Sequence, residues 1–205
     1  MSIKQLIKES GIRDNHTHGK VGDFLRQKIK SGSKLSIVSA YFTIYVYEAL
    51  KDKLDGIENL QFLFGEPRFI KSLDPSKTDK KAYKIEDQGL SLSNRLSQRK
   101  AAIECSEWIR NKVEIRSIRK SNLLHGKMYH IANGDLIDAI MGSSNFTVSG
   151  LGEARNKSNI ELNLIVNDDR DRKELKDWFD AIWIDESLVK DVKDDVFTLR
   201  MQLRF

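Results

Sequence analysis

The chain has 205 residues, of which 40% are hydrophobic and 32% charged, and its net charge at pH 7 is +5. This length and hydrophobic content can build a core without disulfides or metal, so a single α/β domain is expected and a disordered chain is excluded. No stretch approaches 18 apolar residues, and residues 1–10 lack the apolar segment of a signal peptide, which argues against a membrane protein.

The one cysteine, Cys105, cannot form a disulfide within the chain, so a reducing, cytoplasmic setting is expected. Charge is unevenly distributed. Residues 110–127 hold six basic residues and one acid, whereas residues 168–195 hold eleven acids and six basic residues. The basic segment suits a polyanion such as nucleic acid, although two ordinary solvated faces would give the same pattern.

The first half of the chain predicts a crossover unit. Apolar residues recur at helical spacing over residues 21–30, and residues 35–40 are typical of a short buried strand. A helix is expected from Tyr41 to about Leu54, followed by a strand at 59–64. This strand–helix–strand order predicts parallel pairing of the two strands.

A long helix and a half-buried strand are expected next. Residues 68–87 are polar and lysine-rich, which indicates a long surface loop. Residues 91–112 carry an apolar stripe that includes Trp108, expected in the core, and residues 113–118 alternate with period two.

The second half of the chain predicts a hairpin. The apolar segments 127–131 and 136–141 flank Asn133-Gly134, a strong turn signal. A loop or short helix is expected at 143–152 and a strand at 159–166. The helix expected at 171–184 has Trp178 on its apolar stripe, so Trp178 is also expected in the core. The segment 196–205 fits a strand, a helix or a frayed end.

His125-Gly126-Lys127 is the segment that points most clearly to chemistry. On a strand, His125 and Lys127 would point to the same face, where an ammonium repels a metal ion but attracts a phosphate. The imidazole can then attack the phosphate or transfer a proton. The returning hairpin strand brings Ser143 and Asn145 to the same end of the sheet as hydrogen-bond donors, while Gly142 allows close approach of the backbone.

These residues resemble the HKD motif of the phospholipase D superfamily: His125-x-Lys127, then Asp135, then Gly142-Ser143-x-Asn145, with Asn159-x-Glu161 downstream. The similarity is looser upstream, at residues 39–42 and 64–67. Within the superfamily, the chain resembles the single-copy nuclease-like domains found at the N-terminus of DEAD/SNF2-type helicases and in some restriction endonucleases. The expected fold is therefore a phospholipase D-like mixed sheet flanked by helices, over residues 21–185, between an extension at 1–20 and a tail at 186–205.

The resemblance implies a role for each motif residue. His125 would be the nucleophile and form a phosphohistidine, while Lys127 and Asn145 would hold the phosphate oxygens with help from Ser143. Glu161 would accept a hydrogen bond from the far nitrogen of His125. No metal or other cofactor is implied, and a single motif copy implies a homodimer through the active-site face.

Asp135 departs from the family pattern. The superfamily places its aspartate five residues after the lysine, where this chain has Ala132. Asp135 keeps the spacing to Gly142 but not the spacing to Lys127, and it follows a turn dipeptide, so ordinary turn chemistry also explains it.

Further residues are expected to bind substrate or to pack. Ser144, Arg116, Arg119 and Lys120 are expected to contact the substrate. His130 is separated from Lys127 by an odd number of positions, so it should face the other side of the sheet as a structural or surface residue rather than a catalytic one.

Three functions remain open from the sequence. The first is a metal-independent nuclease that acts on DNA and is associated with a helicase or restriction system, with no membrane partner. The second is an inactive DNA-binding domain of such a system. The third is a metal hydrolase built on the segment 14–18, whose His16 and His18 would need further ligands.

Overall fold

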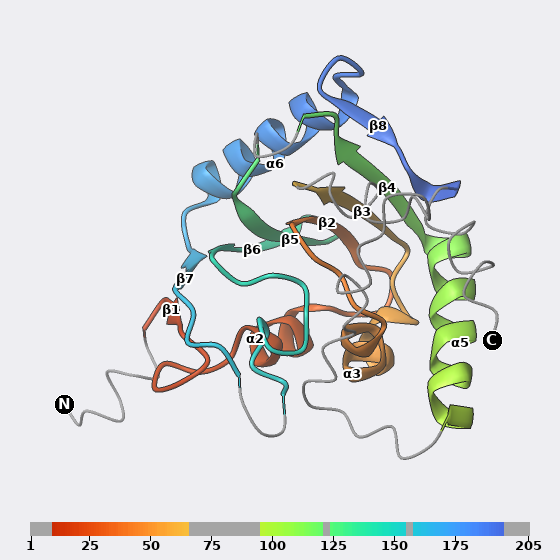
Figure 1. Cartoon of the computed structure of the whole chain (residues 1–205). Coiled ribbons are helices and arrows are strands. Elements are labelled where there is room, and N and C mark those ends of the chain that lie inside the picture. Colours follow the sequence, from red (N-terminus) through yellow and green to blue (C-terminus); the bar gives the residue numbers. More distant parts are fainter. Residues whose placement is uncertain (1–9, 66–94, 121–123, 155–157, 195–205) are drawn as a thin grey trace.

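The computed structural model describes residues 10–65, 95–120, 124–154 and 158–194. Its elements in chain order are β1 (Ile12–Arg13), α2 (Val21–Lys28), β2 (Lys34–Ser39), α3 (Ile44–Leu54), β3 (Asn59–Phe64), α5 (Arg95–Lys112), β4 (Val113–Ile118), β5 (Lys127–Asn133), β6 (Leu136–Gly142), β7 (Asn163–Val166), α6 (Asp169–Ile184) and β8 (Val189–Asp191). The described strands form one sheet in the order β1-β7-β6-β5-β2-β3-β4-β8 (Figure 1).

The centre of the sheet is parallel and its two sides are antiparallel. Strands β2, β3 and β4 run parallel, and each is linked to the next by a stretch that contains a helix. Strand β5 then pairs antiparallel with β2, β6 with β5, and β7 with β6. This confirms the predicted crossover unit and the mixed α/β sheet.

Helices cover both faces of this sheet. The core on one face unites α2, α3 and α5, with the aromatic rings of Tyr47 and Trp108 5.0 Å apart. On the other face α6 packs on Val38 and Met128 through Phe179 and Trp183 (Figure 1). The interior therefore consists of two apolar layers separated by the sheet, as layered α/β packing requires.

The aromatic prediction for α6 was wrong in one respect. Trp108 is buried as expected, but Trp178 is 41% exposed. The side chains that fill the core are those of Phe179 and Trp183, whose rings stack 5.4 Å apart. The helix also starts earlier than predicted, because the Asp168 carboxylate accepts a hydrogen bond from the backbone N–H of Arg170 at 2.9 Å and so caps it.

Helix α3 starts later than predicted, at Ile44. The residue before it, Thr43, has extended backbone angles, and Phe42 is held in an isolated β-bridge with Phe146. The Phe42 ring also stacks on Trp108 at 6.5 Å. Phe42, which follows the end of β2, therefore packs from an extended segment rather than from the first turn of a helix.

The hairpin forms as predicted, but its turn lies one residue further on. Asn133 pairs with Leu136, so Gly134 and Asp135 make the turn. Gly134 has a φ of 62°, a left-handed conformation that glycine adopts without strain. Asn133 instead joins the hairpin to the end of α2, since its amide nitrogen donates to the carbonyl of Lys28 at 3.1 Å.

Strand β7 is shorter than the predicted strand at 159–166. Residues 159–162 do not join the ladder. The backbone N–H of Glu161 instead donates to the Asp14 carbonyl at 3.0 Å, and that of Leu162 donates to the Ser143 hydroxyl at 3.0 Å. The outer strands β1 and β8 have two and three residues and were not predicted. They add parts of the expected N-terminal extension and C-terminal tail to the sheet.

The remaining predicted segments are less fully described. The loop at 68–87, the start of the long helix at 91–94 and the segment 196–205 lie outside the described residues. Residues 143–152 form turns rather than a short helix. No helix in the described ranges is long and apolar enough to cross a bilayer.

Candidate active site

Several of the predicted site residues, among them Lys127, Ser143 and Asn145, gather where strand ends meet at one edge of the sheet. The parallel strand β2 ends there at Ser39, next to the start of β5. The register then pairs Lys127 with Gly142 and Gly142 with Asn163, so β5 starts, β6 ends and β7 starts at this same edge. Ligands of open α/β sheets bind beside such an edge, where loops leave the strands.

His125 and Lys127 lie at the amino-terminal end of β5. His125 precedes β5 and is exposed, and its ring makes no hydrogen bond to the described residues. Because β5 begins only at Lys127, the two residues do not share one strand as predicted. The ammonium of Lys127 instead bends back and donates to the His125 carbonyl at 2.8 Å. An exposed imidazole beside an ammonium is available to an incoming anion.

Asn145 is fixed by its amide oxygen. That oxygen accepts a hydrogen bond from the backbone N–H of Ala40 at 3.1 Å and lies 3.3 Å from the hydroxyl of Ser39. This contact sets which end of the amide faces β2, because only the oxygen can accept these hydrogen bonds. The NH₂ group at the other end makes no hydrogen bond to the described residues. Asn145 therefore keeps two N–H donors for an anion while its oxygen ties the loop to β2.

Ser39 is a residue that the sequence interpretation did not assign to the site. Its buried hydroxyl donates to the Tyr41 carbonyl at 2.8 Å and accepts from the backbone N–H of Phe146 at 2.9 Å. These bonds join the end of β2 to the loop that follows β6. A serine at the end of a largely buried strand was the available signal, because buried polar side chains are normally hydrogen-bonded.

Ser143 and Glu161 form a contact of their own. The Ser143 hydroxyl donates a short hydrogen bond to one carboxylate oxygen of Glu161, and the Asn159 amide donates to the other at 3.1 Å. Glu161 was expected to orient His125, but in this conformation both of its oxygens are engaged by Ser143 and Asn159. A carboxylate held this way fixes the position of the Ser143 hydroxyl at the site edge.

Ser144 lies below the surface of the site. Its side chain is fully buried, its hydroxyl accepts a hydrogen bond from the Asn163 amide at 2.9 Å, and its backbone N–H donates to the Asn163 oxygen at 3.1 Å. The Tyr129 hydroxyl donates to the Ser144 carbonyl at 2.8 Å. Burial, and less strongly the charge of Glu161, raises the pKa of Tyr129 well above its usual value. Ser144 thus anchors the loop and does not face an incoming substrate here.

Asn163 was also missed by the sequence interpretation. It is buried, and besides Ser144 its amide holds the Arg13 carbonyl at 2.9 Å. Gly142 explains the tight spacing, since a Cβ there would overlap the Leu162 carbonyl and come within 2.6 Å of the Asn163 Cα. The glycine of the motif therefore permits close approach of β7, rather than only of an anion.

The basic residues of β4 lie at a different place on the sheet. Strands β2 and β3 separate β4 from β5, a spacing of about 14 Å. Arg116 donates a short hydrogen bond to the Trp183 carbonyl, and Arg119 donates to the carbonyls of Glu186 at 2.7 Å and Val189 at 3.0 Å. Both cations are thereby tied to the end of α6. Lys120 is exposed and makes no ion pair with the described residues.

Asp135 lies at the far end of the hairpin. It is exposed in the turn, while Gly142 and Lys127 lie at the other end of β6 and β5, roughly 20 Å away along the strand. The carboxylate of this hairpin that pairs with a cation is Asp138, 2.7 Å from the Lys28 ammonium. The structure does not bring Asp135 to His125, and its position agrees with turn chemistry.

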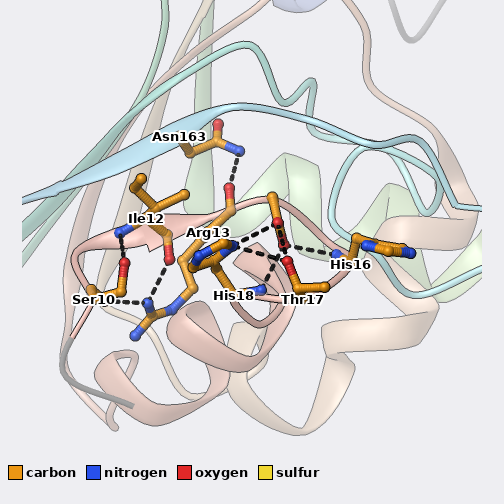
Figure 2. A network of polar contacts seen from close by, with 8 residues as sticks. Ser10, Ile12, Arg13, His16, Thr17, His18 and Asn163 are labelled. Carbon is orange, nitrogen blue, oxygen red and sulfur yellow. Dashed lines mark hydrogen bonds and ion pairs between the residues drawn. The ribbon is translucent and has the colours of Figure 1, made fainter. Parts of the chain in front are cut away.

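The segment 14–18 follows β1 and packs beside the same edge. The Asp14 carboxylate accepts hydrogen bonds from the backbone N–H groups of His16 and His18, from the Thr17 hydroxyl and from the His18 ring, all at 2.8 to 2.9 Å (Figure 2). Partial burial acts to raise the pKa of Asp14, but these bonds hold it well below its usual value. The carboxylate is therefore fully used in shaping the turn.

Neither metal ligation nor catalysis is needed to explain this turn. Asn15 continues it, with its amide donating to the Gly150 carbonyl at 2.7 Å and its oxygen accepting from the N–H of Val21 at 3.0 Å. In the described ranges no three His, Cys, Asp or Glu residues come together in a way that could hold a metal ion. The metal-hydrolase alternative therefore has no ligand set in that part of the chain.

His130 faces away from the site, as predicted. It is buried under α6, and within the described structure its Nε2 has no hydrogen-bond partner. Burial, assisted by the nearby Lys176 and Arg172, lowers the pKa of His130 to about 4. A neutral, buried imidazole on the opposite face of the sheet belongs to the packing of α6 and not to a phosphate site.

A family model and a solved structure are similar to this chain. The family model described as "Cardiolipin synthase, PLD-like domain" matches residues 25–183. No curated protein matches the chain. Among solved structures, polyphosphate kinase from Porphyromonas gingivalis is similar with a TM-score of 0.49 and 10% identity, over 92% of this chain and 22% of the kinase. The family match spans most of the chain, and the chain therefore belongs to the PLD-like domain family and to the phospholipase D superfamily.

Proposed function

We propose that the chain is a phosphodiesterase that cleaves DNA through a covalent intermediate on His125. The observation that carries the proposal is the convergence of one exposed imidazole, one ammonium and the free amide donors of Asn145 at a single sheet edge. These are the groups that a phosphodiester needs: a nucleophile, a counter-charge and neutral donors to its oxygens.

The reaction runs in two displacements. A ring nitrogen of His125 attacks phosphorus, a phosphorus–nitrogen bond forms, and the bond to the leaving oxygen breaks while that oxygen takes up a proton. Water then attacks the phosphohistidine, the phosphorus–nitrogen bond breaks, and the imidazole is restored. Lys127 and Asn145 stabilise the charge on the oxygens in both steps. Neither step draws on a metal ion.

DNA is the proposed substrate because of charge. The chain has a net charge of +5 at pH 7. The basic segment 110–127 leads into the motif, and its last two basic residues are Lys120 and Lys127. Phosphate contacts by such residues give most of the affinity for nucleic acid and make it salt-dependent. The family description names a lipid enzyme, so a phospholipid is the substrate to compare. A helicase or restriction system, in the cytoplasm, is the proposed setting.

A DNA-binding domain without catalysis is the second candidate. It is favoured by the contacts of Glu161, whose two oxygens are engaged by Ser143 and Asn159 rather than by His125. Without a carboxylate partner, the imidazole has no fixed tautomer. In this case the site would bind a phosphodiester and leave it intact.

One experiment separates the two candidates. The chain is incubated with end-labelled single- and double-stranded oligonucleotides in EDTA, quenched in acid-free denaturant, and analysed for a protein–oligonucleotide adduct and for cleavage. We expect both for the wild type and neither for His125→Ala, with His16→Ala as the matched control at an exposed histidine. DNA binding without adduct or cleavage would support the binding domain, and cleavage of phosphatidylglycerol or cardiolipin vesicles alone would transfer the proposal to lipid.

A further inference from the structure

Tyr41 is an exposed aromatic residue that follows the end of β2. Its side chain is 56% exposed, and within the described residues its ring contacts no other aromatic ring and its hydroxyl makes no hydrogen bond. Among the large apolar side chains that are exposed in those residues, Tyr41 and Trp178 are the aromatic ones. Trp178 lies on α6, which covers the face of the sheet opposite the site. The Tyr41 ring is therefore the exposed aromatic surface at the site edge, and it is free to contact a ligand.

The backbone of Tyr41 is held in place although its ring is not. Its N–H donates to the hydroxyl of Ser39 at 3.3 Å, and its carbonyl accepts from that hydroxyl at 2.8 Å. The next residue, Phe42, is fixed by its β-bridge to Phe146 and by its packing on Trp108. The Tyr41 backbone is therefore ordered before any ligand binds, which lowers the entropy that binding would cost.

Tyr41 lies beside Asn145. The Ser39 hydroxyl that binds the Tyr41 backbone also lies 3.3 Å from the amide oxygen of Asn145. The N–H of Ala40, the residue before Tyr41, donates to the same amide oxygen at 3.1 Å. One hydroxyl therefore joins Tyr41 to the residue whose NH₂ group is available to a phosphate.

The segment that carries His125 passes the same strand ends. Gly65, at the end of β3, donates its N–H to the Ser39 carbonyl at 3.2 Å. A Cβ on Gly65 would overlap the carbonyl oxygen of Leu124, so the residue before His125 crosses the end of β3 at close range. Ser39 thus links Gly65 and the neighbouring Leu124 to the backbone of Tyr41.

The strand register gives the same placement. The last pair of the β2–β5 ladder is Val38 with Met128. Tyr41 follows Val38 by three positions, and His125 precedes Met128 by three positions. The two residues therefore lie equally far beyond the end of one ladder, on the two neighbouring chain segments that lead out of it.

An aromatic ring next to a phosphate site is suited to a nucleobase. The base of a nucleotide is joined to its phosphate through one sugar, and stacking on an aromatic side chain is a common way in which proteins hold the bases of single strands. In a duplex both faces of a base are covered by its neighbours, so a ring at this position could stack only on an unpaired base. The headgroup of phosphatidylglycerol offers no flat face of this kind.

We propose that Tyr41 stacks on an unpaired base next to the phosphate at His125, and that the site therefore takes single-stranded DNA. The assignment rests on the proposed function for its substrate, because it adds the recognition of a base to the binding of a phosphate. Every base has a π-face, so the preference is for an unpaired strand and not for a particular sequence.

The test is the affinity of the full 205-residue chain for a short oligonucleotide as a single strand and as a duplex, measured by fluorescence anisotropy. All proteins carry His125→Ala, so that no strand is cut. We expect Tyr41→Ala to weaken binding of the single strand about 10-fold and to leave binding of the duplex unchanged, whereas Tyr41→Phe keeps the ring and binds both as the parent does. Trp178→Ala removes the other exposed aromatic ring and is the matched control, with no change expected. Circular dichroism checks that each variant is folded.

A second measurement locates the stacked base. An abasic nucleotide is placed at each position of the single strand in turn. At one position it should weaken binding about 10-fold when Tyr41 is present and have no effect in Tyr41→Ala, because base and ring belong to the same contact.

The outcomes separate this assignment from the proposed function. A Tyr41→Ala variant that binds the single strand as the parent does, or that loses affinity for single strand and duplex equally, would overturn the assignment, and DNA cleavage by the wild type would leave the proposed function standing. Stacking on Tyr41 in a wild type that leaves DNA uncut would sink the phosphodiesterase and support the assignment. A wild type that binds no oligonucleotide would overturn both.

Discussion

The amide oxygen of Asn145 accepts a hydrogen bond from the backbone N–H of Ala40 at 3.1 Å, which joins the loop after β6 to the end of β2. One side chain therefore has two tasks. Its oxygen holds the site together, and its NH₂ group is left to meet the substrate. Substitutions that keep one atom and remove the other separate the two tasks.

Asn145→Asp keeps the oxygen acceptor and replaces the two N–H donors with a second oxygen. We expect a folded protein whose affinity for an oligonucleotide falls about 10- to 100-fold, since a donor is lost and a negative charge is added near the phosphate. The measurement is fluorescence anisotropy at one fixed salt concentration. Asn111→Asp, at an exposed position of α5, adds the same charge elsewhere and should change the affinity little. Equal losses in both variants would show a general charge effect instead.

Asn163 is the second buried amide of the site, and its contribution is to stability. It satisfies the backbone N–H and the hydroxyl of Ser144 and the carbonyl of Arg13. Asn163→Leu would leave these buried groups without partners, so we expect the free energy of unfolding to fall by about 2 kcal/mol or more. Urea unfolding measures this. The control is Asn167→Leu, at an exposed position just after β7, which should change it by less than about 0.5 kcal/mol.

Asn145 and Asn163 show which features a local sequence pattern can predict and which it cannot. The parallel strands, the hairpin and the edge that carries the motif follow from apolar periodicity, which is local. The partners of Asn145 and Asn163 lie 105 and 19 residues away, at Ala40 and Ser144, and no local pattern indicates them. Glu161 was assigned to His125 by resemblance, whereas the structure engages it with Ser143, because residues 159–162 leave the sheet ladder.

Buried His130 makes stability depend on pH. Its pKa is lowered to about 4 by burial, so the unfolded chain binds a proton there at a higher pH than the folded chain does. The free energy of unfolding is therefore highest above pH 6.5, where His130 is neutral in both states. It falls as the pH drops from about 6.5 toward 4, and His130 accounts for a loss of at most about 3 kcal/mol.

Urea unfolding at pH 7 and pH 4.5 tests this contribution. The wild type should lose more stability between the two pH values than His130→Leu, which cannot be protonated. His16→Leu, at an exposed position, should retain the wild-type loss. If the His130→Leu and wild-type proteins lose the same amount, the pH dependence comes from other groups.

Arg119 and Lys120 are neighbours with different expected roles. The guanidinium of Arg119 binds the carbonyls of Glu186 and Val189 after α6, whereas Lys120 is exposed and makes no such bond to the described residues. Arg119→Ala should therefore lower the free energy of unfolding by about 1 to 2 kcal/mol, because two carbonyls lose a charged donor.

Lys120→Ala should leave stability unchanged and weaken DNA binding equally for all sequences. If Lys120 contacts a phosphate, the slope of log affinity against log salt concentration should become shallower by about 1, since one fewer counterion is released. The affinity of both variants is measured between 50 and 200 mM salt, with Lys34→Ala, on the opposite edge of the sheet and paired with Glu58 at 3.0 Å, as the charge-matched control. An unchanged slope for Lys120→Ala would mean that the bound DNA runs from His125 toward β7 and not toward β4.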